Sequence, residues 1–212
     1  DRGDMAVFRG TGIYKSPDNG ETWNGLPITA ALPTTWSSAY NYVTRIVVSP
    51  TNGYVFSASN GLGIFRSTDG GSNFSLVLGG TNDHYYCDVV VTSTGTLVGS
   101  LSEFGYNTSP TWSPGIYKST NDGTGWTPIT PTTFPSAHER TVLATAPSDP
   151  DVVYALTNTG GYAGDEEDIR FHKITISTGA SADRSANLPD YGATGNFNTQ
   201  GNYNIVVAVK PD

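Results

Sequence analysis

The stretch SPDNGETW, from Ser16 to Trp23, recurs in two related forms further along the chain. STDGGSNF runs from Ser67 to Phe74 and STNDGTGW from Ser119 to Trp126, at a spacing of about 50 residues. We call these three segments the octets. Three copies of one catalytic signature in a single domain would be unusual, whereas a repeat at this period is typical of stacked supersecondary units. The octets therefore predict how the chain folds and indicate little about its chemistry.

Each octet follows a short strand-like segment that ends in an aromatic and a basic residue: GIYKS, GIFRS and again GIYKS. Two more strand candidates precede that segment, for example TRIVVS and YVFSAS around the turn PTNG, or CDVVVT and TLVGSLS around STG. A unit thus contains four strands, here called A to D in order, with the octet joining C to D. Repeated four-stranded antiparallel sheets of this kind are the blades of a propeller, so the sequence predicts an all-β β-propeller with about four blades present.

Three positions of the octet have a predicted structural role. The third residue, Asp or Asn, is expected to accept hydrogen bonds from backbone N–H groups two residues on. The glycine is expected to adopt a positive φ, and the closing aromatic to pack between neighbouring sheets. Together with the opening serines, the structural residues are Ser16, Asp18, Gly20 and Trp23, then Ser67, Asp69, Gly71 and Phe74, then Ser119, Asn121, Gly123 and Trp126.

The pattern SxDxGxTW resembles the Asp-box, or BNR repeat, of sialidases, the sortilin family and xyloglucanase-like glycoside hydrolases. The first octet matches at every defined position. The second has Asn73 for Thr and Phe74 for Trp, and the third has Asn121 for Asp and Gly125 for Thr. A fourth unit, KITISTGASADRSANL, keeps the strands without the box. The resemblance implies a β-propeller whose boxes lie at the blade periphery, away from the active face.

All 212 residues are assigned to one propeller region. We expect a partial blade at about 5–26, full blades at about 43–78, 87–129 and 141–188, and the start of another at 203–210. Four blades would close if the last A strand paired with the first B strand, which removes the sheet edges. The resemblance implies six or more blades, so we expect a segment of a longer propeller, with the remaining blades of the same polypeptide as its partners.

The charge balance excludes some classes of partner. The formal net charge is −8 with only 11 Lys and Arg residues, which argues against nucleic acid binding because phosphate contacts need clustered cations. No apolar run approaches the roughly 20 residues that span a bilayer, so no membrane insertion is expected. Few lysines beside many Ser, Thr, Asn and Tyr residues resemble secreted bacterial proteins, which predicts an extracellular or cell-surface location.

Blade topology places the A–B turns and the octets on one side, and the long D–A and B–C connections on the other. Long loops on a rigid scaffold commonly carry binding sites, and aromatics beside carboxylates suit sugar rings or a protein partner. The alternative is that these aromatics pack within their own loops, above all Trp36 and Trp112 beside prolines. The ligand-binding candidates are Trp36, Tyr40, Tyr42, His84, Tyr85, Tyr86, Tyr106, Trp112, Tyr162 and Tyr191.

Metal and cofactor sites are not expected. The acidic run that contains Asp165 and Asp168 offers oxygen ligands for calcium, but it lacks the alternating spacing and glycine of a calcium loop, so a solvated loop is preferred. The three histidines have no paired spacing for a transition metal. Cys87 is the single cysteine and is expected to be a small buried side chain.

Four carboxylates on the long-loop side are candidates for a glycosidase pair: Glu103, Glu139, Asp83 and Asp190. An arginine triad and an FRIP-like motif of the sialidase kind are absent, since VFRG at 7–10 lacks Ile-Pro. We therefore expect a secreted or cell-surface module that binds glycan or protein without catalysis. The alternative is part of a xyloglucanase-like glycoside hydrolase that uses loop carboxylates as its acid/base pair. A scaffold segment with no ligand of its own is a third possibility.

Overall fold

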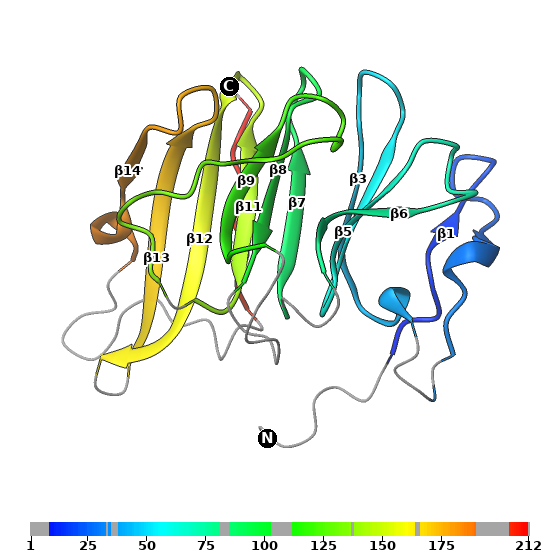
Figure 1. Ribbon diagram of the computed structural model, residues 1–212, viewed down its shortest axis with the longest axis horizontal. Helices are drawn as coiled ribbons and strands as arrows, with labels where there is room; N and C mark the ends of the chain where they lie inside the picture. Colours follow the sequence, from blue (N-terminus) through cyan, green and yellow to red (C-terminus); the bar gives the residue numbers. More distant parts are fainter. Residues whose placement is uncertain are drawn as a thin grey trace.

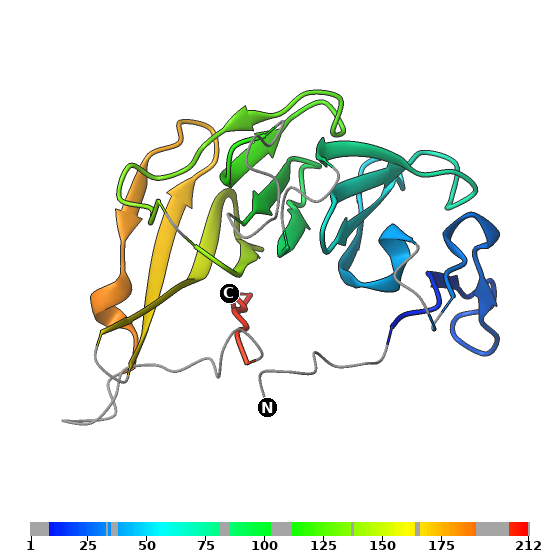
Figure 2. The ribbon, with the colours of Figure 1, turned by 60° about the horizontal axis from the view of Figure 1, so that its bottom comes forward.

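The computed structural model describes residues 9–32, 34, 38–80, 85–102, 112–136, 138–163, 166–189 and 204–211. This part of the chain is all-β, with three short 3₁₀ helices, and its sheets follow one another in an arc from β1 at one end to β14 at the other (Figures 1 and 2). The strands are β1 (Tyr14–Lys15), β2 (Asn24–Gly25), β3 (Val43–Val48), β4 (Val55–Ser59), β5 (Gly63–Ser67), β6 (Ser75–Gly79), β7 (Cys87–Val91), β8 (Leu97–Leu101), β9 (Gly115–Ser119), β10 (Thr127–Pro128), β11 (Thr141–Ala146), β12 (Asp149–Ala163), β13 (Glu166–Thr175) and β14 (Ser181–Asp183). The 3₁₀ helices are η1 (Pro27–Thr29), η2 (Ala39–Asn41) and η3 (Ser185–Asn187).

The strands form antiparallel meanders in which chain order equals sheet order. The first sheet pairs β1 with β2, the second contains β3 to β6, the third β7 to β10, and the fourth β11 to β14. The opening strands β3, β7 and β11 of the three larger sheets lie side by side, so we call them the inner strands. Sheets stacked in this way about an axis are the blades of a β-propeller, as the sequence predicts.

The apolar core lies between the sheets. Successive residues of a strand point to opposite faces, and both faces of the third sheet are apolar. Val89 packs against Phe56 and Ile64 of the second sheet, whereas Val90 packs against Leu143 of the fourth. Buried Cys87 joins the first of these layers, as predicted. Each sheet is therefore held by its neighbours on both sides.

The octets are tight C–D turns closed by their own polar side chains. In the second octet, Ser67 Oγ accepts from Gly71 N at 2.8 Å and donates to Asp69 Oδ1 at 2.9 Å. Asp69 then accepts from Asn73 N at 2.9 Å and Asn73 Nδ2 at 2.7 Å, and these bonds lower the pKa of Asp69 to about 2. The carboxylate of Asp69 therefore accepts from the backbone N–H four residues further on. The sequence predicts an acceptor bond from the N–H two residues further on, but the turn is longer than an Asx-turn.

The other two octets repeat this geometry. Thr22 N donates to Asp18 Oδ1 at 2.8 Å, and Gly125 N donates to Asn121 Oδ1 at 2.9 Å. The octet glycines have the predicted positive φ, at 98° for Gly20, 97° for Gly71 and 77° for Gly123. A carboxylate and an amide oxygen accept the same backbone bond, which explains why Asn replaces Asp at the third position.

The closing aromatics differ among the octets. Trp126 is half-buried against the core between the second and third sheets, as expected. Phe74 lies against Tyr40, with ring centroids 5.8 Å apart. Trp23 instead is 63% exposed, and its indole Nε1 donates to Gly20 O at 3.1 Å. The expectation that it packs between sheets is wrong, because no described sheet precedes the first one.

The fourth unit lacks an octet but braces its C–D turn in another way. Asp151, on β12 after the A–B turn, accepts from Ser177 N at 2.7 Å and from the Ser177 hydroxyl. Asp151, which comes from the neighbouring A–B hairpin, thus accepts the hydrogen bonds that the third octet residue accepts in the other units. Residues 204–211, where a further strand is expected, have no strand pairing in the described part, yet Ile205 packs with Val142 and Leu156 on the outer face of the fourth sheet.

An ion pair between buried Asp88 and partly exposed Arg45 helps to join the three inner strands. Asp88 of β7 is 5% exposed and accepts from Arg45 of β3 through both Nε and Nη2, the latter at 3.0 Å. It also accepts from Leu143 N of β11 at 2.8 Å. Burial raises the pKa of Asp88, against the opposing effect of Arg45. One carboxylate therefore connects three consecutive sheets close to the axis.

Asp88→Asn should lower the free energy of unfolding by about 3 kcal/mol, because it removes the charge that compensates Arg45 and weakens the link to β11. Urea denaturation followed by circular dichroism measures the change. The matched control is Glu21→Gln at an exposed position, which should leave the midpoint within error. Equal midpoints for the two variants would show that the ion pair is not needed to hold the inner strands.

His172 of β13 is fully buried between the third and fourth sheets. Its Nε2 lies 3.2 Å from Thr133 Oγ1, and its ring lies 5.6 Å from that of Phe134. Burial lowers the pKa of His172 below its ordinary value; Asp183 opposes this shift and Arg170 adds to it. The charged form is therefore disfavoured in the folded protein.

Because the folded pKa lies below the unfolded one, the unfolded chain binds the extra proton first. The stability associated with neutral His172 is complete above the unfolded pKa of about 6.5 and is lost progressively as the pH falls from there towards the lowered folded value. Urea midpoints should fall from pH 7.5 to pH 5. In His172→Gln this part of the pH dependence should disappear, and an unchanged slope would assign it to other groups.

Candidate functional site

The long-loop ends of the three inner strands carry residues at equivalent positions. Tyr42, Tyr86 and Arg140 each immediately precede an inner strand, and the carbonyl of each accepts a backbone N–H from a residue just after β4, just after β8 or within β12. The donors are Asn60, Ser102 and Asn158, at distances of 2.9, 3.1 and 2.9 Å. We call these six residues the rim. Since β3, β7 and β11 are neighbours, the rim is a continuous edge of two tyrosines and an arginine backed by short polar side chains.

The fourth sheet extends beyond the rim. The sequence predicts a long B–C loop at TGGYAGDEED, but β12 continues to Ala163 and β13 begins at Glu166. Figure 1 shows the resulting hairpin reaching past the ends of the other strands. The prediction of a loop is wrong because Tyr162 pairs with Glu167 and Ala163 with Glu166, which continues the ladder through the acidic run. Within the described ranges, the long-loop side therefore carries a projecting hairpin.

A bulge marks where this projection leaves the sheet. The register between β12 and β13 shifts between Asn158 and Tyr162. Gly160, with φ of 73°, donates its N–H to Asn158 Oδ1 at 2.7 Å, and Gly161 N donates to Thr159 Oγ1 at 3.1 Å. Bulges commonly redirect side chains near functional sites.

Two acidic residues, Glu139 and Asp168, lie beside consecutive glycines of the bulge. A Cβ placed on Gly160 would lie 2.8 Å from Glu139 Oε1, and one on Gly161 would lie 3.9 Å from the Cβ of Asp168. Glu139 N also donates to Asn158 O at 2.9 Å, which fixes its backbone to β12. The absence of a side chain at Gly160 thus leaves room for the Glu139 carboxylate beside the rim.

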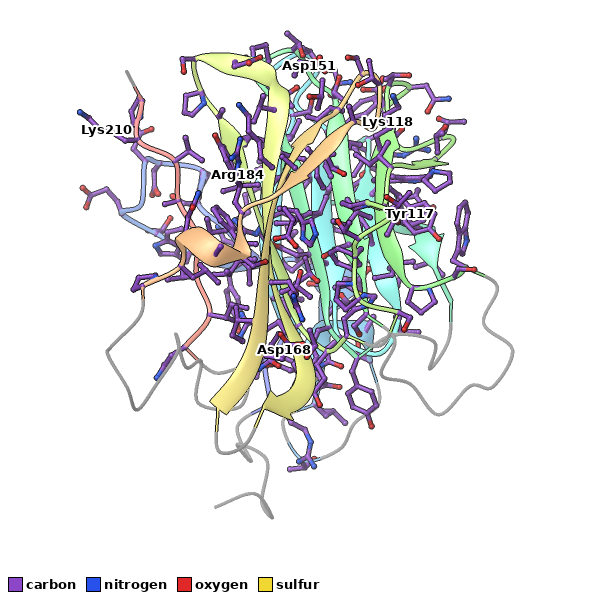
Figure 3. All side chains as sticks on the ribbon, turned by 90° about the vertical axis from the view of Figure 1, so that its left-hand side faces the viewer. Tyr117, Lys118, Asp151, Asp168, Arg184 and Lys210 are labelled. Atoms are coloured by element: carbon purple, nitrogen blue, oxygen red, sulfur yellow. The ribbon has the colours of Figure 1, made fainter. Side chains whose placement is uncertain are left out.

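Asp168 is engaged by protein groups rather than arranged as a metal ligand. It forms an ion pair with Arg170 Nε at 2.9 Å and accepts from Thr159 Oγ1 at 3.3 Å. Figure 3 places it near the projecting end of the fourth sheet, far from Asp151 at the turn end. Within the described ranges no three His, Cys, Asp or Glu residues gather as a metal site requires. Asp165, its proposed companion, lies outside the described residues.

Some of the described aromatic ligand-binding candidates pack against other side chains of the protein, and others are exposed. The ring of Tyr40 lies 5.6 Å from that of Phe65, and burial raises its pKa to about 12. Trp112 packs edge-on against Tyr117 at 5.5 Å and joins the core between the second and third sheets. Tyr42 is 42% exposed, and Tyr85 and Tyr86 are half-buried. Tyr42 and Tyr86 are therefore the aromatic members of the rim.

Several candidates fall outside the part of the chain that is described. Glu139 is the one catalytic candidate within it. For Tyr162 the backbone belongs to β12, and its side chain is not described. The remaining candidates outside the described residues are Glu103, Asp83, Asp190, Trp36, His84, Tyr106 and Tyr191.

Arg140, Asn158, Thr159 and Arg170 are not among the candidates that the sequence predicts. A signal for two of them exists in the repeat itself. Arg140 occupies the position that Tyr42 and Tyr86 hold before the A strand. Asn158 corresponds to Asn60, because each donates its backbone N–H to the residue before the inner strand of its own sheet. Aligning the units on their inner strands, rather than on the octets, identifies these positions.

Comparison with known proteins gives a likeness of fold. No protein-family model matches the sequence, and no curated protein matches it. Among solved structures, the GH74 enzyme of Niastella koreensis has a TM-score of 0.59 and 20% identity, over 82% of this chain and 26% of that chain. An ancestral GH74 enzyme has a TM-score of 0.57 and 18% identity, over 83% and 23%. The chain thus shares the fold of about a quarter of these glycoside hydrolases.

Among the described residues, no helix is both long and apolar enough to cross a bilayer.

Gly160→Ala should displace the Glu139 carboxylate, because the new methyl would overlap Oε1 and the residue would have to keep a positive φ. The free energy of unfolding should fall by about 1 kcal/mol or more. The control is Gly61→Ala, where φ is 82° and the methyl meets no neighbour. A crystal structure of each variant tests whether Glu139 moves in the first alone, and an unmoved Glu139 in Gly160→Ala would contradict the assigned contact.

Proposed function

We propose that the rim and the adjoining β12–β13 hairpin bind a polysaccharide, and that the protein does so outside the cell. The observation that carries this proposal is the placement of Tyr42 and Tyr86 at equivalent ends of neighbouring inner strands. Aromatic faces suit stacking on sugar rings, while Asn60 and Arg140, which are partly exposed, suit sugar hydroxyls. Ser102 and Asn158 are buried and support the rim from behind. The net charge of −8 favours a neutral glycan over an acidic one.

A β-glucan of the plant cell wall, such as xyloglucan, is the first probe. The octets resemble those of xyloglucanase-like glycoside hydrolases, and the fold is shared with part of two GH74 enzymes. The secreted location is supported by the composition and by the class of these neighbours. A surface protein is the competing partner, and it would be indicated if no polysaccharide binds while a protein does.

Tyr42→Ala should weaken xyloglucan binding roughly tenfold, or about 1.4 kcal/mol, because it removes an exposed stacking surface. Isothermal titration calorimetry with a soluble xyloglucan oligosaccharide measures the change. Tyr14→Ala is the matched control, since Tyr14 is 50% exposed on β1, away from the rim. Equal loss in both variants, or none in either, would remove the rim from the binding site.

Hydrolysis is the second candidate function, and the contact of Glu139 and Asp168 with consecutive residues of one bulge favours it. Glycoside hydrolases use two carboxylates that flank the bond they cleave. Glu139 is proposed as the acid/base residue and Asp168, which forms an ion pair with Arg170, as its partner. Glu139→Gln should abolish release of reducing sugar while xyloglucan binding remains. Binding without turnover in the unaltered protein would leave the non-catalytic module as the function.

A further inference from the structure

Two buried imidazoles contact the connection between β10 and β11. We call this connection, residues 129–136 and 138–140, the connecting segment; it has no strand in its described residues. The ring of Phe134 lies 4.9 Å from that of His138 and 5.6 Å from that of His172. His138 is 3% exposed and His172 is fully buried. Phe134 therefore packs against two buried rings, one from its own segment and one from the fourth sheet.

Each imidazole joins the connecting segment to a different sheet. His138 Nε2 lies 3.0 Å from the carbonyl oxygen of Leu101, the last residue of β8. Because a carbonyl oxygen only accepts, His138 donates from this nitrogen to the third sheet. His172 Nε2 of β13 lies 3.2 Å from the hydroxyl of Thr133, which belongs to the segment. The segment is thus attached to both sheets through the two rings.

The same segment positions two residues of the candidate site. Glu139 N donates to Asn158 O at 2.9 Å, and Asn158 N donates to Arg140 O at 2.9 Å. The start of the segment is fixed separately, because Thr130 Oγ1 accepts from Ile116 N at 2.9 Å. Between these two places the segment is held by its contacts with the rings. Loss of those contacts would let its last residues move away from β12.

His172 is poorly placed to carry a charge while these contacts are made. Burial lowers its pKa; Asp183, opposite it on β14, opposes this shift, and Arg170 adds to it. Its Nδ1 has no hydrogen-bond partner among the described residues, so the imidazolium would hold an unpaired N–H and a charge in the core. Besides His138, the other charged residues on the elements around this layer are Asp88, Lys118, Asp151, Asp168, Glu139 and Arg140.

We propose that the connecting segment is closed on the fourth sheet at neutral pH and opens when His172 takes up a proton. Opening exposes the imidazole to water, where the charged form is hydrated. Glu139 N and Arg140 O then leave Asn158, so the candidate site is intact at neutral pH and disrupted in acid. The opening is local, because β8, β12 and β13 keep their own strand pairing. The inference concerns the protein without a glycan and does not rest on the proposed function.

Proton linkage gives the size of the effect. The pKa of His172 is lowered in the closed form, so the stability of that form is complete above the ordinary pKa of about 6.5 and is lost as the pH falls below it. If the closed form binds no proton, the equilibrium constant for opening rises about 30-fold from pH 7.5 to pH 5. Such a change is large enough to measure at single amides.

Amide hydrogen exchange followed by NMR tests the opening. The protection factors of the Glu139 and Asn158 amides should fall at least about tenfold from pH 7.5 to pH 5. The matched reference is the Asn60 amide, which donates to Tyr42 O at the equivalent place of the second sheet and has no described histidine beneath it. The amide of Val98, on a strand paired on both sides, reports global unfolding. Both should keep their protection.

Two variants and one titration identify the group. In His172→Gln the protection of the two segment amides should no longer depend on pH. Thr133→Val, at an exposed position, removes the partner of Nε2 and should lower their protection at pH 7.5 without changing that of Val98. In the unaltered protein, the NMR titration of the His172 ring should coincide with the loss of protection.

Four results would overturn the proposal. They are segment amides whose protection does not change with pH, an unchanged pH dependence in His172→Gln, and a parallel loss of protection at Val98, which would mean that the whole molecule unfolds. The fourth is proton uptake by His172 while the segment amides stay protected. That measurement needs no variant, so it decides the question even if His172→Gln does not fold.

Discussion

A β-sheet that is apolar on both faces needs a neighbour on each side. The third sheet shows this constraint most clearly, since Val89 is buried against the second sheet and Val90 against the fourth. At about 25 cal/mol per Å² of apolar surface, leaving either face in water would remove the main stabilising contribution to the fold. The stacked arrangement of the blades follows from this double burial.

Polar contacts fix how the stacked sheets sit relative to one another. Apolar layers are non-directional, so they do not by themselves determine the rotation between blades. Asp88 determines it near the axis by contacting Arg45 and Leu143 at the same time. At the turn side, Lys15, Arg66 and Lys118 fix it by donating hydrogen bonds to backbone carbonyls in the C–D turn of the next sheet. These contacts hold neighbouring sheets together near the axis and at the C–D turns. The long-loop side of the molecule can therefore differ from unit to unit.

That freedom is visible in the candidate site. The rim residues share backbone hydrogen bonds but differ in chemistry, with Tyr42, Tyr86 and Arg140 at one repeated position. The fourth unit departs furthest, because it has lost the octet and gained a long hairpin at the other end of the same strands. Asp151 maintains its turn in place of the missing third octet residue. The fourth unit thus keeps its sheet although one stabilising contact has been replaced by another, and its long-loop side differs from that of the other units.

The sequence by itself determined the repeat, the four-strand content of a unit and the tight turns, because each depends on residues close together in the chain. Ser67, Asp69 and Gly71 close one turn by hydrogen bonds among themselves. The turn can therefore be predicted from their spacing in the sequence. The sequence did not determine the extended β12–β13 hairpin, because its acidic run resembles a solvated loop. The strand conformation there depends on pairing across the hairpin. The exposure of Trp23, the hydrogen bonds from Lys15, Arg66 and Lys118 to the next sheet, and the position of Glu139 against Gly160 were decided only by tertiary structure. These depend on which sheet lies beside which, and the partners are separated by tens of residues in the chain, beyond the reach of any local pattern.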